Sequence, residues 1–443
     1  MDIKKPLSSL SVILVVSIVL VFSACKFFGG GDDDDVSVTS VSLNISSTSL
    51  NVGGTTTLIA SVSPDDATNQ NVTWTTSNVA VASVSSEGIV TAVTAGTAVV
   101  SVTTEDGGFV AGCDVTVSEV IPGIGDIYIA GYYAGSPSDV SCFWLNNESG
   151  QTDLYSDSNS HANSVYVSEG DVYVAGFYYN GSNKVSCYWL NSGSPIDLFN
   201  NSSAGYHAEA YDIFVSGSDI YVSGFCEEGD GVKVACYWVN GSITKIIPVV
   251  GKNSEINSIY YDGSDIYSAG YYVNASGTEI ACYWKNTTKT DLSPANWGRA
   301  ESITVQNSTV YTSGWSDNSG KNACYWVNSS RIILHDSSIS IGNSIFLNGS
   351  DIYVAGSYKN GVNFISCYWL NGGAPVVLYD ETASGDDSEA KSIVVSGSDI
   401  YIAGYYSDSD TSIKSCYWKN GVLEALSDGD SYDTKATSIF VDN

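Results

Sequence analysis

Four glutamates near the start of repeated strand-like segments could carry acid–base chemistry. They are Glu209, Glu255, Glu301 and Glu389. Enzymes that cleave glycosidic bonds use two carboxyl groups, about 5–5.5 Å apart when the anomeric configuration is retained and about 6.5–9.5 Å apart when it is inverted. This set alone could supply such a pair in this chain, and the sequence leaves the separation open. A glycan-cleaving hydrolase or lyase is therefore one candidate function.

Other catalytic signatures are scarce. The 443 residues include three histidines, His161, His207 and His335, which leaves little for general-base or metal chemistry. The sequence has no Gly-x-Ser-x-Gly turn, no His-Glu-x-x-His motif and no phosphate-binding loop. We therefore expect a protein that is not an enzyme and that uses no cofactor or metal ion.

The same parts of the repeats carry side chains suited to binding. One loop follows a run of aromatic residues, and another leads into a strand that begins with charged or amide side chains. Sugar rings stack on aromatic faces and hydrogen-bond through their hydroxyls, and Tyr, Trp and Arg also dominate protein interfaces. The pattern thus fits a glycan and a protein ligand equally. The candidate ligand-binding residues are Trp297, Arg299, Glu301, Trp315, His161, Glu209, Tyr211, Glu255, Glu389, Lys391, Tyr133, Tyr178, Tyr272 and Tyr406.

Two aromatic positions follow a glycine in each repeat, and we expect them to differ in role. The first is aromatic in six of the seven repeats, which favours packing between repeats over ligand contact. The second position, together with Trp297 and Trp315, is the better candidate for ligand contact because its residue type varies more.

These candidates belong to a segment repeated seven times between Gly125 and Asn443. Its clearest copy reads GSDIYVAG, a variable stretch, SCYWLNG, a second variable stretch, and a strand ending in SIVV. The repeated cysteine stands at Cys142, Cys187, Cys236, Cys282, Cys324, Cys367 and Cys416. A period of this size, built from strand-like segments, predicts a β-propeller.

The phase of the repeat predicts how the propeller closes. The first copy begins with what reads as a second strand, and the chain ends on a first-strand segment at residues 436–441. We therefore expect seven four-stranded blades over residues 125–443, closed by pairing of the C-terminal strand with the N-terminal blade. Function is expected on the end that carries the variable loops, because loops on a rigid scaffold are where sites are built.

Positions common to all repeats are expected to pack. Equivalent cysteines in adjacent blades would lie about 10 Å apart, beyond the reach of a disulfide or a shared metal ion, so we expect buried thiols. The IYVAG run followed by Tyr and Trp resembles kelch blades weakly, without the kelch double glycine. It is more similar to propeller repeats of bacterial lipoproteins, a resemblance that implies no activity.

Residues 36–118 alternate apolar and polar residues in short runs broken by Gly and Pro, a pattern typical of a β-sandwich. They resemble the bacterial Ig-like group 2 family (BIG2). The matching landmarks are Leu43, Leu50, Gly53, Leu58, Ala60, Val62, Pro64, Val72, Trp74, Ser77, Val84, Gly88, Val90, Thr91, Ala92, Gly96 and Ala98. The resemblance implies a stalk or spacer, although some copies in adhesins bind host or matrix proteins. Residues 119–124 read as a linker.

The N-terminus predicts export and lipidation. Lys4 and Lys5 precede a short apolar stretch, and Phe22-Ser23-Ala24-Cys25 resembles the lipobox of bacterial lipoproteins. The resemblance implies that residues 1–24 are a signal peptide and that Cys25 carries the lipid. Residues 25–35 then read as the lipidated cysteine and a flexible acidic tether. We expect anchoring in the bacterial cell envelope, at the outer membrane or cell surface.

The charge balance narrows the possible partners. The chain has 48 acidic and 17 basic residues and a net charge of −31, which argues against binding nucleic acid through its phosphates. The whole sequence predicts an all-β protein, an Ig-like sandwich followed by a seven-bladed propeller, held at the membrane by a lipid. We expect a non-catalytic platform for a glycan or protein ligand. A purely structural envelope component is the third possibility.

Overall fold

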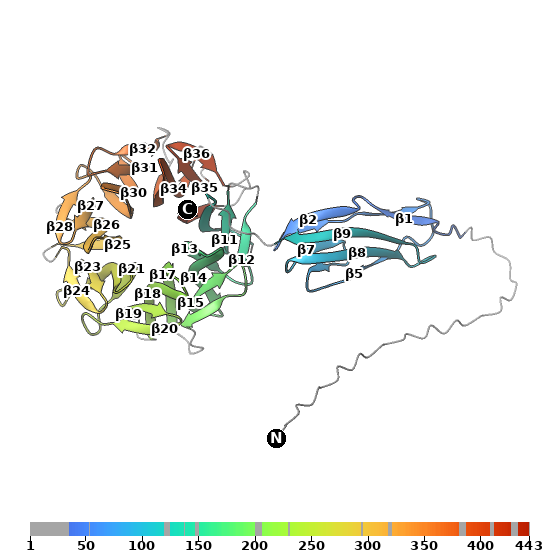
Figure 1. The fold of residues 1–443 in the computed structure, drawn as a ribbon, viewed down its shortest axis with the longest axis horizontal. Helices are drawn as coiled ribbons and strands as arrows, with labels where there is room; N and C mark the ends of the chain where they lie inside the picture. The colour runs from blue at the N-terminus through green and yellow to red at the C-terminus, as the bar shows by residue number, and fades with distance from the viewer. Residues whose placement is uncertain are drawn as a thin grey trace, which may run out of the picture.

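The computed structural model describes residues 35–442, except 53, 119–124, 137, 147–149, 200–205, 229–230, 294–295, 318–320, 381–386, 408–411 and 427–432. All the secondary-structure elements of the described residues are β-strands, so this part of the chain is all-β, as predicted (Figure 1). The expected signal peptide and Cys25 lie outside the described residues. Within the described part of the chain, no helix is long and apolar enough to cross a membrane.

The N-terminal module is built from nine strands. They are β1 (Ser40–Leu43), β2 (Ser47–Asn51), β3 (Thr55–Thr57), β4 (Ala60–Ser63), β5 (Val72–Thr76), β6 (Ala82–Val84), β7 (Ile89–Ala92), β8 (Gly96–Thr104) and β9 (Val110–Ser118). The sheets have the orders β2-β9-β8-β5, β3-β7-β6 and β1-β4. Leu58, Val100 and Cys113 lie in the apolar core between them, and Trp74 packs against that core.

Among the described residues after Gly125, the strands form seven four-stranded sheets, which we number 1 to 7. The strands of each sheet are named below from the innermost strand, the first, to the outermost, the fourth. Sheets 1 to 3 are β37 (Thr434–Val441), β10 (Ile127–Tyr133), β11 (Val140–Leu145), β12 (Thr152–Tyr155); β13 (Ser160–Ser168), β14 (Asp171–Asn180), β15 (Asn183–Leu190), β16 (Ile196–Phe199); and β17 (Tyr206–Ser216), β18 (Asp219–Glu228), β19 (Lys233–Val239), β20 (Ser242–Ile246). Sheets 4 and 5 are β21 (Ser254–Tyr261), β22 (Ile266–Val273), β23 (Glu279–Lys285), β24 (Thr288–Asp291); and β25 (Gly298–Gln306), β26 (Thr309–Asp317), β27 (Lys321–Val327), β28 (Ser330–Ile333). Sheets 6 and 7 are β29 (Ser340–Asn348), β30 (Asp351–Asn360), β31 (Asn363–Leu370), β32 (Val376–Tyr379); and β33 (Ser388–Ser396), β34 (Asp399–Ser407), β35 (Ile413–Lys419), β36 (Val422–Ala425).

Sheet 1 contains both ends of the repeat region. Its inner strand β37 pairs antiparallel with β10, from Ile127 opposite Val441 to Tyr133 opposite Thr434. Inner strands of successive sheets contact each other, and β37 contacts both β33 and β13. Figure 1 shows the sheets arranged around a common centre, with their inner strands toward it.

The repeated tryptophan and cysteine form the packing between sheets. The tryptophan two residues after each repeated cysteine, such as Trp144 and Trp418, is at most 2% exposed in all seven repeats, and the seven repeated cysteines are fully buried. All cysteines of the described chain are thiols and not disulfides, and burial raises the pKa of repeated thiols such as Cys187 well above the ordinary value. The prediction of buried thiols is therefore confirmed.

At one end of each sheet, an asparagine turn is hydrogen-bonded to the second strand of the same sheet. The turn between the third and fourth strands begins with an asparagine at positive φ, such as Asn191 at 49° and Asn371 at 52°. Asparagine tolerates this conformation better than most residues. Its Oδ1 also accepts the backbone N–H of the second strand, as Asn191 does from Val172 at 2.8 Å. This end, which we call the short-turn end, therefore shares one asparagine–backbone hydrogen bond in all seven sheets.

The opposite end, which we call the mouth end, is shaped by a β-bulge in each inner strand. In β13 the register shifts between Ala162 and Ser164, and the other six inner strands shift at the equivalent point. The repeated glycine of the second strand lies against this bulge. A Cβ on Gly356 would overlap the carbonyl oxygen of Ile341, and the six equivalent glycines are equally close to theirs. The second strand therefore requires a glycine opposite the bulge, because any larger residue would overlap the backbone of the inner strand.

Candidate functional site

The mouth end carries two equivalent positions at each junction between neighbouring sheets. The first, on the inner strand, holds the mouth residues His161, Glu209, Glu255, Arg299, Ile341, Glu389 and Lys435. The second lies at the start of the third strand of the preceding sheet. It holds the facing residues Asp139, Lys184, Lys233, Glu279, Lys321, Phe364 and Ile413.

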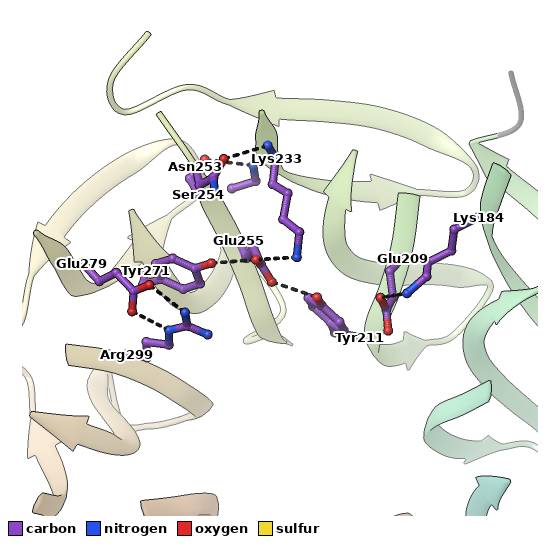
Figure 2. A network of polar contacts seen from close by, with 11 residues as sticks. Lys184, Glu209, Tyr211, Lys233, Asn253, Ser254, Glu255, Tyr271, Glu279 and Arg299 are labelled. Atoms are coloured by element: carbon purple, nitrogen blue, oxygen red, sulfur yellow. Dashed lines mark hydrogen bonds and ion pairs between the residues drawn. The ribbon is translucent and has the colours of Figure 1, made fainter. Parts of the chain in front are cut away.

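Four consecutive junctions, from sheets 1/2 to sheets 4/5, are bridged between these positions. Three have ion pairs, and the first has a hydrogen bond between Asp139 and His161, whose lowered pKa favours the neutral imidazole. The nitrogen–oxygen distances are 2.9 Å for Asp139–His161, 2.7 Å for Lys184–Glu209, 2.9 Å for Lys233–Glu255 and 2.7 Å for Glu279–Arg299. The sign of the charge reverses along this series, yet the two partners always change together. Figure 2 shows the last three of these pairs. We call these junctions the paired sector.

Glu255 shows how fully the paired sector satisfies its charges. Its carboxylate accepts hydrogen bonds from Lys233 Nζ at 2.9 Å, Tyr271 Oη at 2.6 Å and Tyr211 Oη at 2.8 Å. Burial raises the pKa of Glu255, but Lys233 and the tyrosine hydroxyls outweigh this effect, so the pKa lies below its ordinary value. Glu255 is only 6% exposed, and its contacts leave it as a structural carboxylate (Figure 2).

The other ends of the paired sector are equally well packed. Arg299 makes a bidentate pair with Glu279 at 2.8 and 2.7 Å and lies over the Tyr271 ring at 4.1 Å. His161 stacks on Tyr132 with ring centroids 3.6 Å apart and an interplanar angle of 2°. Burial lowers the pKa of His161 against the opposing effect of Asp139. These side chains therefore have partners within the protein.

The remaining three junctions, sheets 5/6, 6/7 and 7/1, cannot form such pairs because one member is apolar in each. The combinations are Lys321 with Ile341, Phe364 with Glu389, and Ile413 with Lys435. We call this contiguous stretch the unpaired sector. The Lys435 ammonium lies over the Tyr405 ring at 4.9 Å, and Glu389 accepts from Lys391 Nζ at 3.1 Å and Tyr405 Oη at 2.8 Å.

A pocket of about 400 Å³ lies in the unpaired sector. Its lining residues are Phe364, Asp387, Glu389, Tyr405, Ser407, Ile413 and Lys435. The volume lies within the range of roughly 300–1,000 Å³ that is usual for small-molecule sites. The pocket therefore combines apolar walls with two carboxyl groups, two hydroxyl groups and an ammonium group.

Exposed apolar side chains continue this sector along the rim. Trp297 is 47% exposed, Ile339 43% and Val362 71%. In four of the other five repeats, the position of Trp297 and Ile339 holds a residue that accepts a backbone N–H of the third strand, as Asp387 does from Phe364 at 2.7 Å. Indole and aliphatic groups cannot accept that bond. The adjacent sheets 5 and 6, where Trp297 and Ile339 lie, therefore lack it.

The bulged residues of the inner strands mostly hold neighbouring sheets together. Asn163, Asn257 and Asn343 each donate to a carbonyl of the next sheet, at 2.8 to 3.0 Å. Two bulged residues are charged. Burial raises the pKa of Glu301, which accepts from Asn257 at 2.9 Å. Burial alone would lower the pKa of Lys391, but Glu389 and Glu301 raise it.

The aromatic candidates are placed differently from the sequence expectation. Second-position tyrosines bond to the outer strand of their own sheet: Tyr133 to Asp153 at 3.1 Å, Tyr178 to Asp197 at 2.9 Å and Tyr272 to Asp291 at 3.2 Å. Tyr406 packs on Tyr379 with centroids 4.9 Å apart.

First-position aromatics instead contact mouth residues. Tyr271 bonds Glu255 and Tyr405 bonds Glu389. Trp315 is only 5% exposed, with Lys321 over its ring at 4.6 Å. Successive residues of a strand face opposite sides of the sheet, so the first position faces the mouth residues and the second position faces away from them. Ligand contact at the second position and at Trp315 stays a prediction.

Sequence reasoning missed the facing residues and most of the pocket lining. The sequence did contain a signal for them. In four repeats the third strand begins with a polar or charged residue, and the mouth residue of the next repeat can carry the opposite charge. Phe364 and Ile413 break that pattern in consecutive repeats. Comparing residues across junctions rather than within repeats would have found both sectors.

Comparison with known proteins identifies the N-terminal module. Residues 37–115 match the family model of the bacterial Ig-like domain (group 2). This module is a group 2 bacterial Ig-like domain. It agrees with the resemblance drawn from Trp74 and the other landmarks.

Curated relatives match only short stretches. An α-L-arabinofuranosidase of Bifidobacterium longum is 53% identical over 62 residues, covering 14% of this chain and 6% of that protein. An uncharacterised protein of Clostridium acetobutylicum is 31% identical over 119 residues, covering 26% of this chain and 12% of that protein. The chain therefore spans a small fraction of the length of the curated relatives it matches.

Similar solved structures include β-propellers at low sequence identity. A quinonprotein alcohol dehydrogenase-like protein of Bacteroides thetaiotaomicron aligns with a TM-score of 0.46 and 13% identity, over 90% of this chain and 99% of that one. The β-propeller domain of the Trilobed protease of Pyrococcus furiosus aligns with a TM-score of 0.42 and 10% identity, over 76% and 97%.

Proposed function

We propose that sheets 1 to 7 are the blades of one closed seven-bladed propeller and that its mouth end is a non-catalytic binding platform. The pairing of β37 with β10 supports closure, because it places both ends of the repeat region in one sheet. The contacts of β37 with β33 and β13 support the same arrangement. The ligand is a glycan or a protein.

The division of the mouth end into two sectors carries this proposal. Four junctions satisfy their charges internally, whereas three consecutive junctions replace one partner with Ile or Phe. A scaffold needs the same contact at every junction, so a contiguous departure marks the part that serves something outside the scaffold. The pocket and the exposed rim residues Trp297 and Ile339 lie in or beside this same stretch.

The available groups suit recognition through stacking and hydrogen bonds. Trp297 offers an exposed aromatic face, which either a sugar ring or an apolar side chain can cover. Glu389 and Lys435 offer an acceptor and a donor within the pocket. Arg299, Glu209, Glu255 and His161 support the mouth from the paired sector and are not proposed to touch the ligand.

The proposed location follows from the N-terminal part of the chain. A lipid on Cys25 would anchor the protein in a bacterial envelope, and the Ig-like domain would act as a spacer between the membrane and the propeller. A net charge of −31 disfavours nucleic acid and anionic lipid headgroups as ligands of the propeller.

A binding screen with the purified chain tests the platform. The chain is applied to a glycan array and to a panel of immobilised extracellular matrix proteins, and Trp297→Ala is compared with Thr288→Ala at the short-turn end. The proposal expects a specific ligand whose binding falls at least about tenfold in Trp297→Ala and stays unchanged in Thr288→Ala. Equal loss in both variants would contradict the assignment of the mouth end.

A second candidate function, glycan cleavage, is favoured by one observation. Glu301 has a raised pKa and Glu255 a lowered one, and environments that push two carboxyl pKa values apart are typical of an acid and a base. Glu255 is already bonded to Lys233, Tyr211 and Tyr271, which weakens its claim to a free role. Released oligosaccharide products in the same screen, abolished by Glu301→Gln, would favour this function instead.

A further inference from the structure

We propose that the pocket lined by Phe364, Glu389, Tyr405 and Lys435 is a subsite for one or two neutral sugar residues of a glycan. This inference rests on the proposed binding platform and names its ligand class. It follows from what replaces the ion pairs at junctions 6/7 and 7/1, and from which polar groups remain directed at the pocket.

The apolar walls of the pocket occupy the two facing positions. Phe364 and Ile413 stand where Lys184 and Lys233 bond to mouth glutamates in the paired sector. Phe364 is half-buried, and so is Tyr405, which pairs with Glu389 in the register of β33 with β34. A phenyl ring and a phenol ring at one pocket can cover the C–H face of a sugar, for which an ion pair would leave no room.

The polar groups of the pocket match vicinal hydroxyls. Glu389 takes its bonds from Lys391 and Tyr405 on Oε2, and Asp387 takes the Phe364 N–H on Oδ1. The second oxygen of each carboxylate is then available to accept a hydroxyl proton. Lys435 lies on the Tyr405 ring opposite apolar Ile413, so its ammonium can donate to a hydroxyl oxygen.

The charge of the lining selects among sugars. Two carboxyl groups and one ammonium line the pocket, and the second ammonium nearby, Lys391, is bonded to Glu389. A uronic acid would bring a third carboxylate next to Asp387 and Glu389, which is unfavourable. A neutral sugar adds no charge. A protein ligand would bury about 800 Å² on this chain, so it would have to cover far more of the mouth end than this pocket.

Saturation-transfer NMR and calorimetry on the full chain test the subsite. The probes are methyl glycosides of glucose, galactose, mannose, xylose and arabinose, together with methyl glucuronide and methyl glucosaminide. We expect at least one neutral glycoside to bind, at least about tenfold tighter than the glucuronide. Phe364→Ala and Lys435→Met should each weaken it at least about tenfold. Phe364→Tyr, which keeps the ring, should bind within about threefold of the wild type.

The controls separate this inference from the platform itself. Thr290→Val, in the pocket of the short-turn end that Tyr267 and Lys285 also line, should leave the affinity unchanged. Unchanged affinity in Phe364→Ala and Lys435→Met, or preference for the glucuronide or the glucosaminide, would overturn the inference. If no glycoside binds while the screen finds a ligand that depends on Trp297, the subsite is refuted and the platform stands. If neither finds a ligand, both fail.

Discussion

Removing the Lys233 ammonium should destabilise the protein measurably, because the buried Glu255 carboxylate then loses its ion-pair partner. The change Lys233→Met keeps the length and apolar stem of the side chain, so that the lost interaction is the 2.9 Å pair with Glu255 and the contact with the Phe225 ring at 4.2 Å. Packing of the stem remains.

The magnitude follows from the burial of the two partners. Removing one partner of a buried ion pair costs about 3–5 kcal/mol. Here the Glu255 side chain is 8% exposed but that of Lys233 is 36% exposed, and Glu255 keeps its bonds from Tyr211 and Tyr271. We therefore expect a loss of about 2 kcal/mol, which corresponds to a fall in Tm of about 3–4 °C for a unit of this size.

Lys285→Met is the matched control. Lys285 pairs with Asp265 at 2.9 Å, the same distance, but lies at the short-turn end with side-chain exposures of 48% and 28%. Exposed pairs contribute little to stability, so Tm should fall by less than about 1 °C. Differential scanning calorimetry of both variants at pH 7 makes the comparison. Equal shifts in the two variants would refute the reasoning that burial makes the paired sector stronger than the surface pairs.

Four further predictions follow from the same contacts. Ile341→Glu should create a pair with Lys321 like that of Lys184 with Glu209, and raise Tm by about 1–2 °C; a fall in Tm would show that the two positions do not face each other. Gly356→Ala, whose Cβ would overlap the Ile341 carbonyl oxygen, should lower Tm far more than Gly217→Ala, which meets no atom within 4 Å and has only the strain of a positive φ of 55°; circular dichroism melts compare them. Deleting residues 436–443 removes the strand paired with β10 and should leave an aggregated or unfolded domain by size-exclusion chromatography, whereas a monomeric folded product would contradict closure. Because burial lowers the folded-state pKa of His161, its neutral form favours folding, so stability should fall as pH drops through about 6.5; His161→Gln should flatten the dependence of Tm on pH over that window, and an unchanged slope would contradict it.

Much of the fold could be predicted because its signals repeat. Trp144, Cys142 and their equivalents recur in a fixed frame, so packing positions separate from variable ones without any structure. The phase of the first and last copies also predicted which strand β10 would pair with. Residue types such as Trp74 and Gly88 likewise sufficed to recognise the Ig-like domain.

The site was predicted only in part, for two physical reasons. The sequence does not show which face of a strand turns toward the mouth residues, so Tyr133 and Tyr272 were chosen over Tyr132 and Tyr271. Ion pairs such as Lys233–Glu255 join residues of different sheets, and their presence depends on a junction geometry that the repeat pattern does not contain. Trp297 departs in residue type from the other repeats and its side chain is exposed; its contact with a ligand stays a prediction.

Hydrogen–deuterium exchange measured with and without the ligand found by the screen tests the central claim most directly. We predict protection of backbone amides in the strands that form the unpaired sector: β27, β29, β31, β33, β35 and β37. Strands β17, β19 and β21 of the paired sector should exchange at the same rate in both samples. Protection confined to the paired sector or to the turns of the short-turn end would contradict the account.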